Sequence, residues 1–439
     1  MSRRILIRGG SVLSLGAKTP NYPEADVLIE DDRVLEVGQG LRARDAEVVD
    51  AADSIVMPGF VDTHRHAWRS LFRNLGGSLE STSPATYGPH YQPEDVYAGT
   101  LVGLLGAVES GVTTVVDWCD IPSGDEYTDA AIQAHSDAAL RTVLVHSHPQ
   151  WASDRPKPSD LSGRLPSGPD QPDGSSVLAF GSDDPSSSNL DRLGEEWAVA
   201  RQKGLRIHAH AGSVQPGLIA QMGSAGLLGE DVTLIHCTAA TEDDLAAAAA
   251  AGAQVSLAPV GEMSGGLGPP PVQALIENRL RPGLGVGSEP ATPGDLFAQM
   301  RAVISIQHAT LFDRKLAGKA SLPPLLSTRE VIRYATIDGS RAAGLSGVTG
   351  SLEPGKQADV IVLRADSPNI FPINDPIGAV VWGMDTSNVD WVFAAGKVLV
   401  RHGELEADVE RARTLAMAAH RRVAAAAGVL AGTAAGGPE

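Results

Sequence analysis

One stretch of the sequence decides the fold: Met57-Pro58-Gly59-Phe60-Val61-Asp62-Thr63-His64-Arg65-His66. An apolar run of strand length ends here in two histidines that are two residues apart. Successive side chains of a strand point to opposite faces, so His64 and His66 point the same way and can chelate one ion through their imidazole nitrogens. The rival interpretation is a pair of hydrogen-bonded core histidines, and the rest of the chain decides between the two.

Outward from this stretch, the centre of the chain alternates short apolar runs with alanine-rich helical segments, which is the pattern of parallel βα units. The eight runs that we expect to be strands are residues 55–61, 112–116, 142–145, 177–180, 205–207, 232–235, 255–257 and 284–287. A doubly wound sheet would also fit this count. Polar residues and histidines, however, gather just after these runs, where barrel enzymes place their chemistry. The sequence therefore predicts an α/β fold built on a (β/α)8 TIM-type barrel.

The two ends of the chain have a different texture, with short strands and hairpin turns. We expect residues 1–55 and 350–405 to form one composite small β-sandwich domain around a barrel of residues 56–349. Residues 406–439 read as a C-terminal helix that frays into a glycine-rich tail. The segment 149–176 is rich in proline, serine, glycine and aspartate, which predicts a lid or a disordered loop.

The composition limits the partners of the protein. A net charge of −18 would repel nucleic acid and anionic membranes, so we expect a small-molecule substrate. The N-terminal apolar run stops at Arg8, too early for a signal peptide or a membrane span, which favours a cytoplasmic protein. The two cysteines, Cys119 and Cys237, form no CxxC motif and are expected to be buried apolar residues.

The setting of His64 and His66 resembles the amidohydrolase superfamily, particularly its cytosine-deaminase-like and triazine-hydrolase-like branch. The resemblance covers nearly the whole chain, because residues 350–359, GSLEPGKQAD, look like the return of that family into its small β-domain. It implies a hydrolase with one divalent metal ion, zinc first and ferrous iron second. By analogy it also implies a homodimer.

The resemblance assigns roles to residues on further strands. His64, His66 and His210 would bind the metal, and His236 on strand 6 would contact the hydrolytic water. The glutamate that often follows the strand-5 histidine by three residues is replaced by Ser213, which we keep as a catalytic candidate. The spacing agrees with a barrel, since His210 and His236 are 26 positions apart, the length of one βα unit.

Strand 8 departs from the family pattern. It reads Leu284-Gly285-Val286-Gly287-Ser288-Glu289, so Gly287 occupies the position of the usual metal-binding aspartate. No lysine lies between Ser175 and Gly181, which argues against a dinuclear site built on a carbamylated lysine. Glycine can neither coordinate a metal nor accept a proton, so something else must compensate.

Two compensations are open at this point. Glu289 could serve as ligand or proton carrier, or additional histidines at the mouth, His146, His148 and His208, could take part as ligands or substrate contacts. Trp118, next to Asp117 after strand 2, is a further candidate for the pocket wall. Asp295 is better explained as a helix N-cap than as a displaced ligand.

The leading hypothesis is metal-assisted deamination or C–N bond hydrolysis of a small cyclic amine, amide or lactam. A divalent ion would activate water for attack on the ring carbon, His236 would stabilise the developing oxyanion, and Glu289 would carry the proton. The alternative is a barrel that runs acid/base chemistry such as isomerisation, dehydration or cyclisation, without metal. A non-catalytic scaffold is the third and weakest hypothesis, because so many titratable groups face one pocket.

Overall fold

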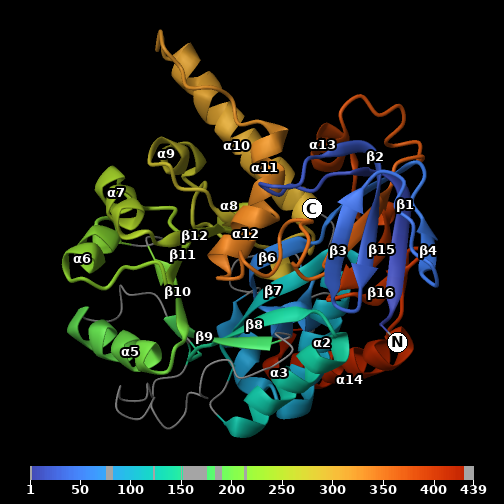
Figure 1. The fold of residues 1–439 in the computed structure, drawn as a ribbon. Helices are drawn as coiled ribbons and strands as arrows, with labels where there is room; N and C mark the ends of the chain where they lie inside the picture. The colour runs from blue at the N-terminus through green and yellow to red at the C-terminus, as the bar shows by residue number, and fades with distance from the viewer. Residues whose placement is uncertain are drawn as a thin grey trace, which may run out of the picture.

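The structure is a computed structural model that describes residues 2–75, 83–121, 124–149, 151, 176–182, 190–211 and 215–429. Two separate sheets organise the chain, a parallel barrel and a mixed sheet built from both ends of the sequence. The N-terminal strands lie beside strands from the C-terminal part of the chain, on one side of the barrel (Figure 1). The predicted α/β fold with a TIM-type barrel and a small β-domain is confirmed.

The barrel consists of eight parallel strands whose spatial order follows the sequence. They are β6 (Phe60–Arg65), β7 (Val112–Cys119), β8 (Arg141–His146), β9 (Ser176–Ser182), β10 (Arg206–Ala211), β11 (Val232–His236), β12 (Gln254–Leu257) and β13 (Gly283–Leu284). The circle closes just beyond β13, where the N–H of Gly287 donates to His64 O at 2.8 Å and the N–H of His66 donates to Gly287 O at 2.9 Å. Closure places the ends of the first and last strands side by side.

The alternation of side chains on the strands explains the core. Ile207 and Ala209 of β10 point outward into the large core that includes Trp197 of the preceding helix, α5 (Leu190–Gln202). Val116 of β7 and Ile235 of β11 point inward and belong to a separate cluster inside the barrel. Near the ends of the strands, the inward-pointing positions are therefore available for polar side chains at the mouth of the barrel.

The predicted strand 55–61 is not one strand. It divides at Gly59 into β5 (Ser54–Pro58), which belongs to the small sheet, and β6, which begins the barrel. A side chain would not fit at the division, because a Cβ atom on Gly59 would lie 2.2 Å from the side chain of Thr113. The N–H of Gly59 donates to Asp359 O at 3.0 Å, which fixes the crossing point between the two sheets.

The small sheet has nine strands in the order β17-β16-β15-β14-β5-β1-β2-β3, with β4 paired to β1. The remaining strands are β1 (Arg4–Val12), β2 (Tyr22–Glu30), β3 (Arg33–Gly38), β4 (Glu47–Asp50), β14 (Val360–Arg364), β15 (Val389–Ala394), β16 (Lys397–Arg401) and β17 (Glu404–Leu405). The antiparallel pairing of β14 with β5 joins the C-terminal strands to the N-terminal ones. The domain limits at residues 55, 350 and 405 stay a prediction.

Helices lie around the outside of the barrel (Figure 1). They are η1 (Ala67–Phe72), α1 (Pro84–Tyr87), η2 (Gly88–His90), α2 (Pro93–Glu109), α3 (Asp125–Ala138), α5 (Leu190–Gln202), α6 (Leu218–Ser224), α7 (Glu242–Ala251), α8 (Pro259–Ser264), α9 (Val272–Glu277), η4 (Glu289–Ala291), α10 (Leu296–Leu316), α11 (Thr328–Tyr334), α12 (Ile337–Ala342), α13 (Pro376–Gly378), η5 (Ala379–Gly383), η6 (Thr386–Asn388) and α14 (Val409–Ala427). Helix α14 packs beside α2 through Ala419 and Val423. Across the described ranges, none of these helices combines the length and the apolar character that a membrane crossing requires.

The remaining predictions concern the two cysteines, the lid and the C-terminal tail. Cys119 and Cys237 are buried free cysteines, as expected. Residues 150 and 152–175 of the predicted lid, and residues 430–439 of the tail, lie outside the described residues.

Candidate active site

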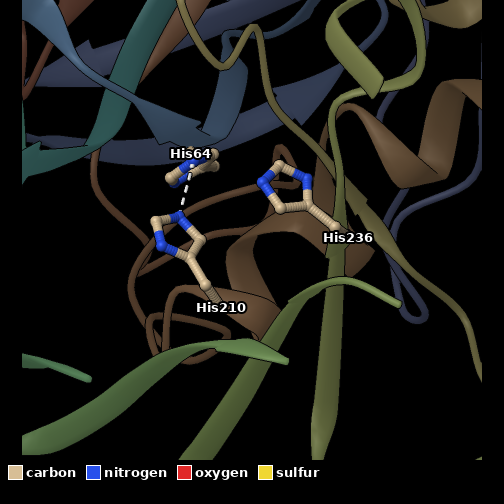
Figure 2. Close-up of side chains that lie close together, drawn as sticks. All are labelled: His64, His210 and His236. Carbon is tan, nitrogen blue, oxygen red and sulfur yellow. Dashed lines mark hydrogen bonds between the residues drawn. The ribbon is translucent and has the colours of Figure 1, made fainter. Parts of the chain in front are cut away.

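Three histidines from different strands converge at the mouth of the barrel. His64 of β6, His210 of β10 and His236 of β11 each offer a nitrogen, and these three atoms lie within 4.8 Å of one another. Nε2 of His64 and Nε2 of His210 are 3.3 Å apart, and the His236 ring is turned toward both (Figure 2). We call these three residues the histidine triad.

Ring packing holds the triad in place. His210 stacks between Trp118, with ring centroids 4.1 Å apart, and His236, with centroids 5.3 Å apart. His64 stands nearly perpendicular to His210 and His236, with interplanar angles of 83° and 85°. Trp118, predicted to line the pocket, is thus placed directly against the triad.

The electrostatic setting keeps the imidazoles of His64 and His210 neutral. Burial, and after it the neighbouring imidazoles, hold the pKa of His64 and that of His210 well below the usual range. Nδ1 of each ring is buried and has no hydrogen-bond partner in the described part of the chain. Neutral imidazoles with free nitrogens are the donors that zinc takes in proteins, so the residues present fit a divalent ion.

His66 borders the triad, and a carboxylate engages one of its two ring nitrogens. Its Nδ1 lies 2.9 Å from Oδ1 of Asp120, which also accepts from Nε1 of Trp68 at 2.8 Å, while Oδ2 of Asp120 pairs with Arg69. Burial acts to raise the pKa of Asp120, but Arg69 and His66 outweigh it and hold that pKa below its usual range. Asp120 was missed in the sequence, although it follows Trp118 by two residues.

His236 is hydrogen-bonded to a second carboxylate, which was also not predicted from the sequence. Its Nδ1 lies 3.0 Å from Oε1 of Glu262, a fully buried residue of α8. The same oxygen accepts the N–H of Ala258 at 2.7 Å. The signal was present, because Glu262 follows strand β12 by five residues at the mouth of the barrel.

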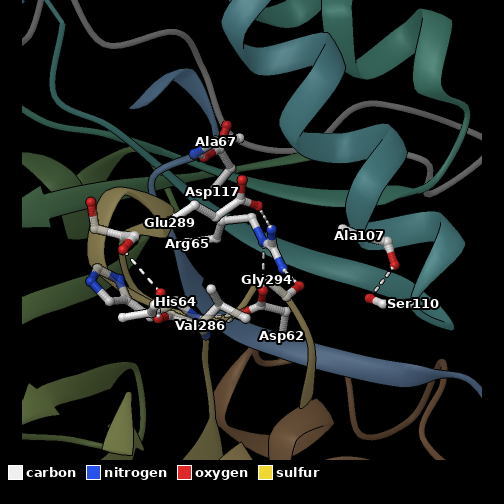
Figure 3. A network of polar contacts seen from close by, with 12 residues as sticks. Asp62, His64, Arg65, Ala67, Ala107, Ser110, Asp117, Val286, Glu289 and Gly294 are labelled. Atoms are coloured by element: carbon white, nitrogen blue, oxygen red, sulfur yellow. Dashed lines mark hydrogen bonds and ion pairs between the residues drawn. The ribbon is translucent and has the colours of Figure 1, made fainter. Parts of the chain in front are cut away.

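The end of strand 8 holds a dense charge network instead of a metal ligand (Figure 3). The Arg65 guanidinium donates to Oδ2 of Asp62 at 2.7 Å, to Oε1 of Glu289, and to Gly294 O at 2.7 Å. Oε2 of Glu289 pairs with Arg73 at 2.7 Å. Both oxygens of the predicted proton carrier are thus taken by guanidinium groups. We call Asp62, Arg65, Arg73 and Glu289 the strand-8 ion network.

Gly287 has a conformational role here. Its φ of +77° lies in the left-handed region, which disfavours side chains. A Cβ atom built on it would lie 3.2 Å from Cβ of Ala258.

Asp295 accepts the N–H of Ala298 at 2.8 Å, which confirms its role as N-cap of α10.

Comparison with known proteins identifies the family. Residues 55–399 match the amidohydrolase family. The chain belongs to the amidohydrolase family. Among curated relatives, the 5'-deoxyadenosine deaminase of Methanothermobacter thermautotrophicus is 27% identical over 92% of this chain and 94% of its own length. The 5-methylthioadenosine/S-adenosylhomocysteine deaminase of Desulfitobacterium hafniense is 28% identical, with the same two coverages.

Solved structures of this family agree with the fold. A zinc complex of the atrazine chlorohydrolase of Arthrobacter aurescens superposes with a TM-score of 0.81 at 21% identity, covering 95% of this chain and 100% of that one. A zinc-bound adenosine deaminase from Xanthomonas campestris gives a TM-score of 0.82 at 20% identity, covering 96% and 98%. The prediction of an amidohydrolase-type enzyme acting on carbon–nitrogen bonds is confirmed.

The other predicted site residues are placed on their strands or lie outside the described ranges, and no metal-binding group among the described residues includes His146, His148 or His208. His208, two residues before His210 on β10, is fully buried with neither ring nitrogen hydrogen-bonded in the described chain. Burial lowers its pKa to about 3. His146 ends β8 and His148 follows it, both partly exposed. Ser213 lies outside the described residues.

Asp117 has a structural position under the site. Its carboxylate accepts the N–H of Ala67 and lies 2.8 Å from Nε2 of His135. His135 contacts Thr142 through its other ring nitrogen. Asp117 thus anchors the chain that follows the His64–His66 pair.

Proposed function

We propose that the chain is a metal-dependent hydrolase that removes the amino group of a heterocyclic amine. The observation that carries the proposal is the convergence of His64, His210 and His236 at the barrel mouth. The deaminase names of the curated relatives favour an amine as the leaving group, and make 5'-deoxyadenosine and 5-methylthioadenosine the first substrates to test. The proposed ion is zinc, since two structural neighbours contain it.

The buried pair His64 and His210 would hold the ion, with His66 and His236 beside them. When bound, such an ion supplies a Lewis acid that makes water nucleophilic near neutral pH. The hydrolysis forms one C–O bond, breaks one C–N bond and moves a proton from water to the departing amine. Trp118 closes one wall of the site by stacking on His210.

One imidazole–carboxylate pair is available to carry that proton. It is His66 with Asp120, and the carboxylate holds the ring in one orientation. Glu289 is a weaker candidate, because Arg65 and Arg73 occupy its oxygens. We propose instead that Glu289 stabilises the end of strand 8.

The test combines metal analysis with a screen for ammonia release. We expect about one zinc per purified chain, and release of ammonia that stops with a chelator and returns with added zinc. The substrates to screen are adenine nucleosides, aminotriazines and other cyclic amines, with lactams for ring opening.

A metal-free chain whose activity ignores chelators would contradict the proposal. It would favour the alternative of isomerisation, dehydration or cyclisation, which the absence of a strand-8 acid at Gly287 keeps open. The homodimer and the cytoplasmic location stay predictions, to be measured by sedimentation and by fractionation.

A further inference from the structure

The pair formed by Glu262 and His236 is built more firmly than a chance contact. Glu262 is completely buried, and its Oε1 accepts from both His236 Nδ1 and the N–H of Ala258. A buried carboxylate is costly unless a partner compensates for its lost hydration. The compensating side chain in the described part of the protein is His236.

This contact fixes the tautomer of His236. A carboxylate accepts hydrogen bonds, so the proton lies on Nδ1 and the lone pair lies on Nε2. The ring faces His64 and His210 (Figure 2). An imidazole held in this way by an outer carboxylate is the usual arrangement of a histidine that ligates a metal.

A purely structural role explains only part of the geometry. Glu262 does cap α8 through the N–H of Ala258, but a neutral glutamine would accept that hydrogen bond equally well. Oε2 of Glu262, moreover, is buried and has no hydrogen-bond partner among the described residues. The contact that the helix cap does not explain is the hydrogen bond between Glu262 and His236.

The backbone of β11 supports the same interpretation. His236 has a φ of +75° and Cys237 a φ of +54°, so two consecutive residues with side chains adopt the left-handed conformation. The N–H of Cys237 donates to Ala211 O at 3.2 Å, which ties this turn to the end of β10 beside His210. Strain of this kind concentrates at functional sites, where the surrounding structure maintains it.

We infer that Glu262 is a positioning residue that makes His236 the third metal ligand of the triad, in compensation for the carboxylate that strand 8 lacks at Gly287. The inference rests on the proposed function, because it assumes that an ion is bound. It differs from the expectation that His236 contacts only the hydrolytic water.

The test measures zinc affinity by competition with a chelating dye, independently of turnover. We expect Glu262→Gln to bind zinc about 10-fold more weakly and Glu262→Ala about 100-fold more weakly than the wild type, the range measured for outer carboxylates of metal sites. The absorption spectrum of the cobalt-substituted protein should change in both variants, since the ligand geometry changes. Glu196→Gln, a buried carboxylate on α5 paired with Arg192, is the matched control and should change neither reading.

A double substitution separates positioning from general destabilisation. In a His236→Ala background, Glu262→Gln should cause no further loss of affinity, because the residue that it positions is gone. Equal losses with and without His236, or wild-type affinity in Glu262→Ala, would overturn the inference and leave the proposed function standing. A wild-type protein without zinc affinity would overturn both.

Discussion

The histidine triad at the mouth of the barrel and the charged residues at the end of strand 8 lie next to each other. They differ in how their polar side chains are partnered. In the histidine triad, Nε2 of His64 and Nε2 of His210 lie 3.3 Å apart, and Nδ1 of each ring is buried without a hydrogen-bond partner among the described residues. In the strand-8 ion network, Arg65 is paired with Asp62 and Glu289, and Glu289 is paired again with Arg73. The two regions meet at Gly287, whose backbone bonds to both His64 and His66.

This difference indicates which of the two regions binds a ligand. The oxygens of Glu289 are both paired with guanidinium groups within the protein, whereas the imidazole nitrogens of the triad converge from three strands within 4.8 Å of one another, which suits an ion. By this criterion Glu289 supports the site and the triad receives the ion. Four substitutions test this contrast.

The largest effect is expected when the triad itself is broken. His210→Ala removes an imidazole from between Trp118 and His236, so zinc should be lost and turnover should fall by about 1,000-fold, or about 4 kcal/mol of barrier. Metal analysis and ammonia release measure this. His308→Ala, remote on α10, is the control. A metal-loaded, active His210→Ala protein would remove the triad from the chemistry.

The second effect concerns stability. Arg65→Met removes the central cation of the strand-8 ion network. It leaves the buried carboxylate of Asp62 without a cation and Glu289 with Arg73 alone, so the free energy of unfolding should fall by about 3 kcal/mol. Urea denaturation gives the value. The folded fraction should still bind zinc, and zinc loss from a folded protein would show that the two regions are not separate.

A smaller loss is expected for Glu289→Gln, because Arg65 keeps Asp62 as a partner. We expect the free energy of unfolding to fall by about 2 kcal/mol. Turnover should stay within about 10-fold of the wild type. A loss of about 100-fold or more at unchanged zinc content would match a general acid–base contribution and would restore Glu289 as proton carrier.

The smallest effect is expected for Gly287→Asp, which restores the family's carboxylate to strand 8. The left-handed backbone should cost about 1 kcal/mol of stability, and zinc affinity should not rise, because the added Cβ points toward Ala258. Gly287→Ala separates the backbone cost from the carboxylate. Tighter zinc binding in the aspartate variant alone would mean that the position still reaches the ion.

The sequence predicted the barrel, the two-ended small sheet and the strands that carry His64, His210 and His236. It was wrong about residues 55–61, because the steric demand of Thr113 on Gly59 appears only when β5 and β7 are brought together. It also missed Asp120 and Glu262, which carry no motif of their own. Their importance comes from the histidines that they contact.

What the sequence determined by itself is local: the alternation of a strand places His64 and His66 on one face, and the alternation of apolar runs with helical segments indicates parallel βα units. The tertiary structure decided which histidines meet and which charges are neutralised. Arg65 and Glu289 are separated by 224 positions, and His236 and Glu262 by 26. Contacts over such separations depend on barrel closure and strand register, which no short motif encodes.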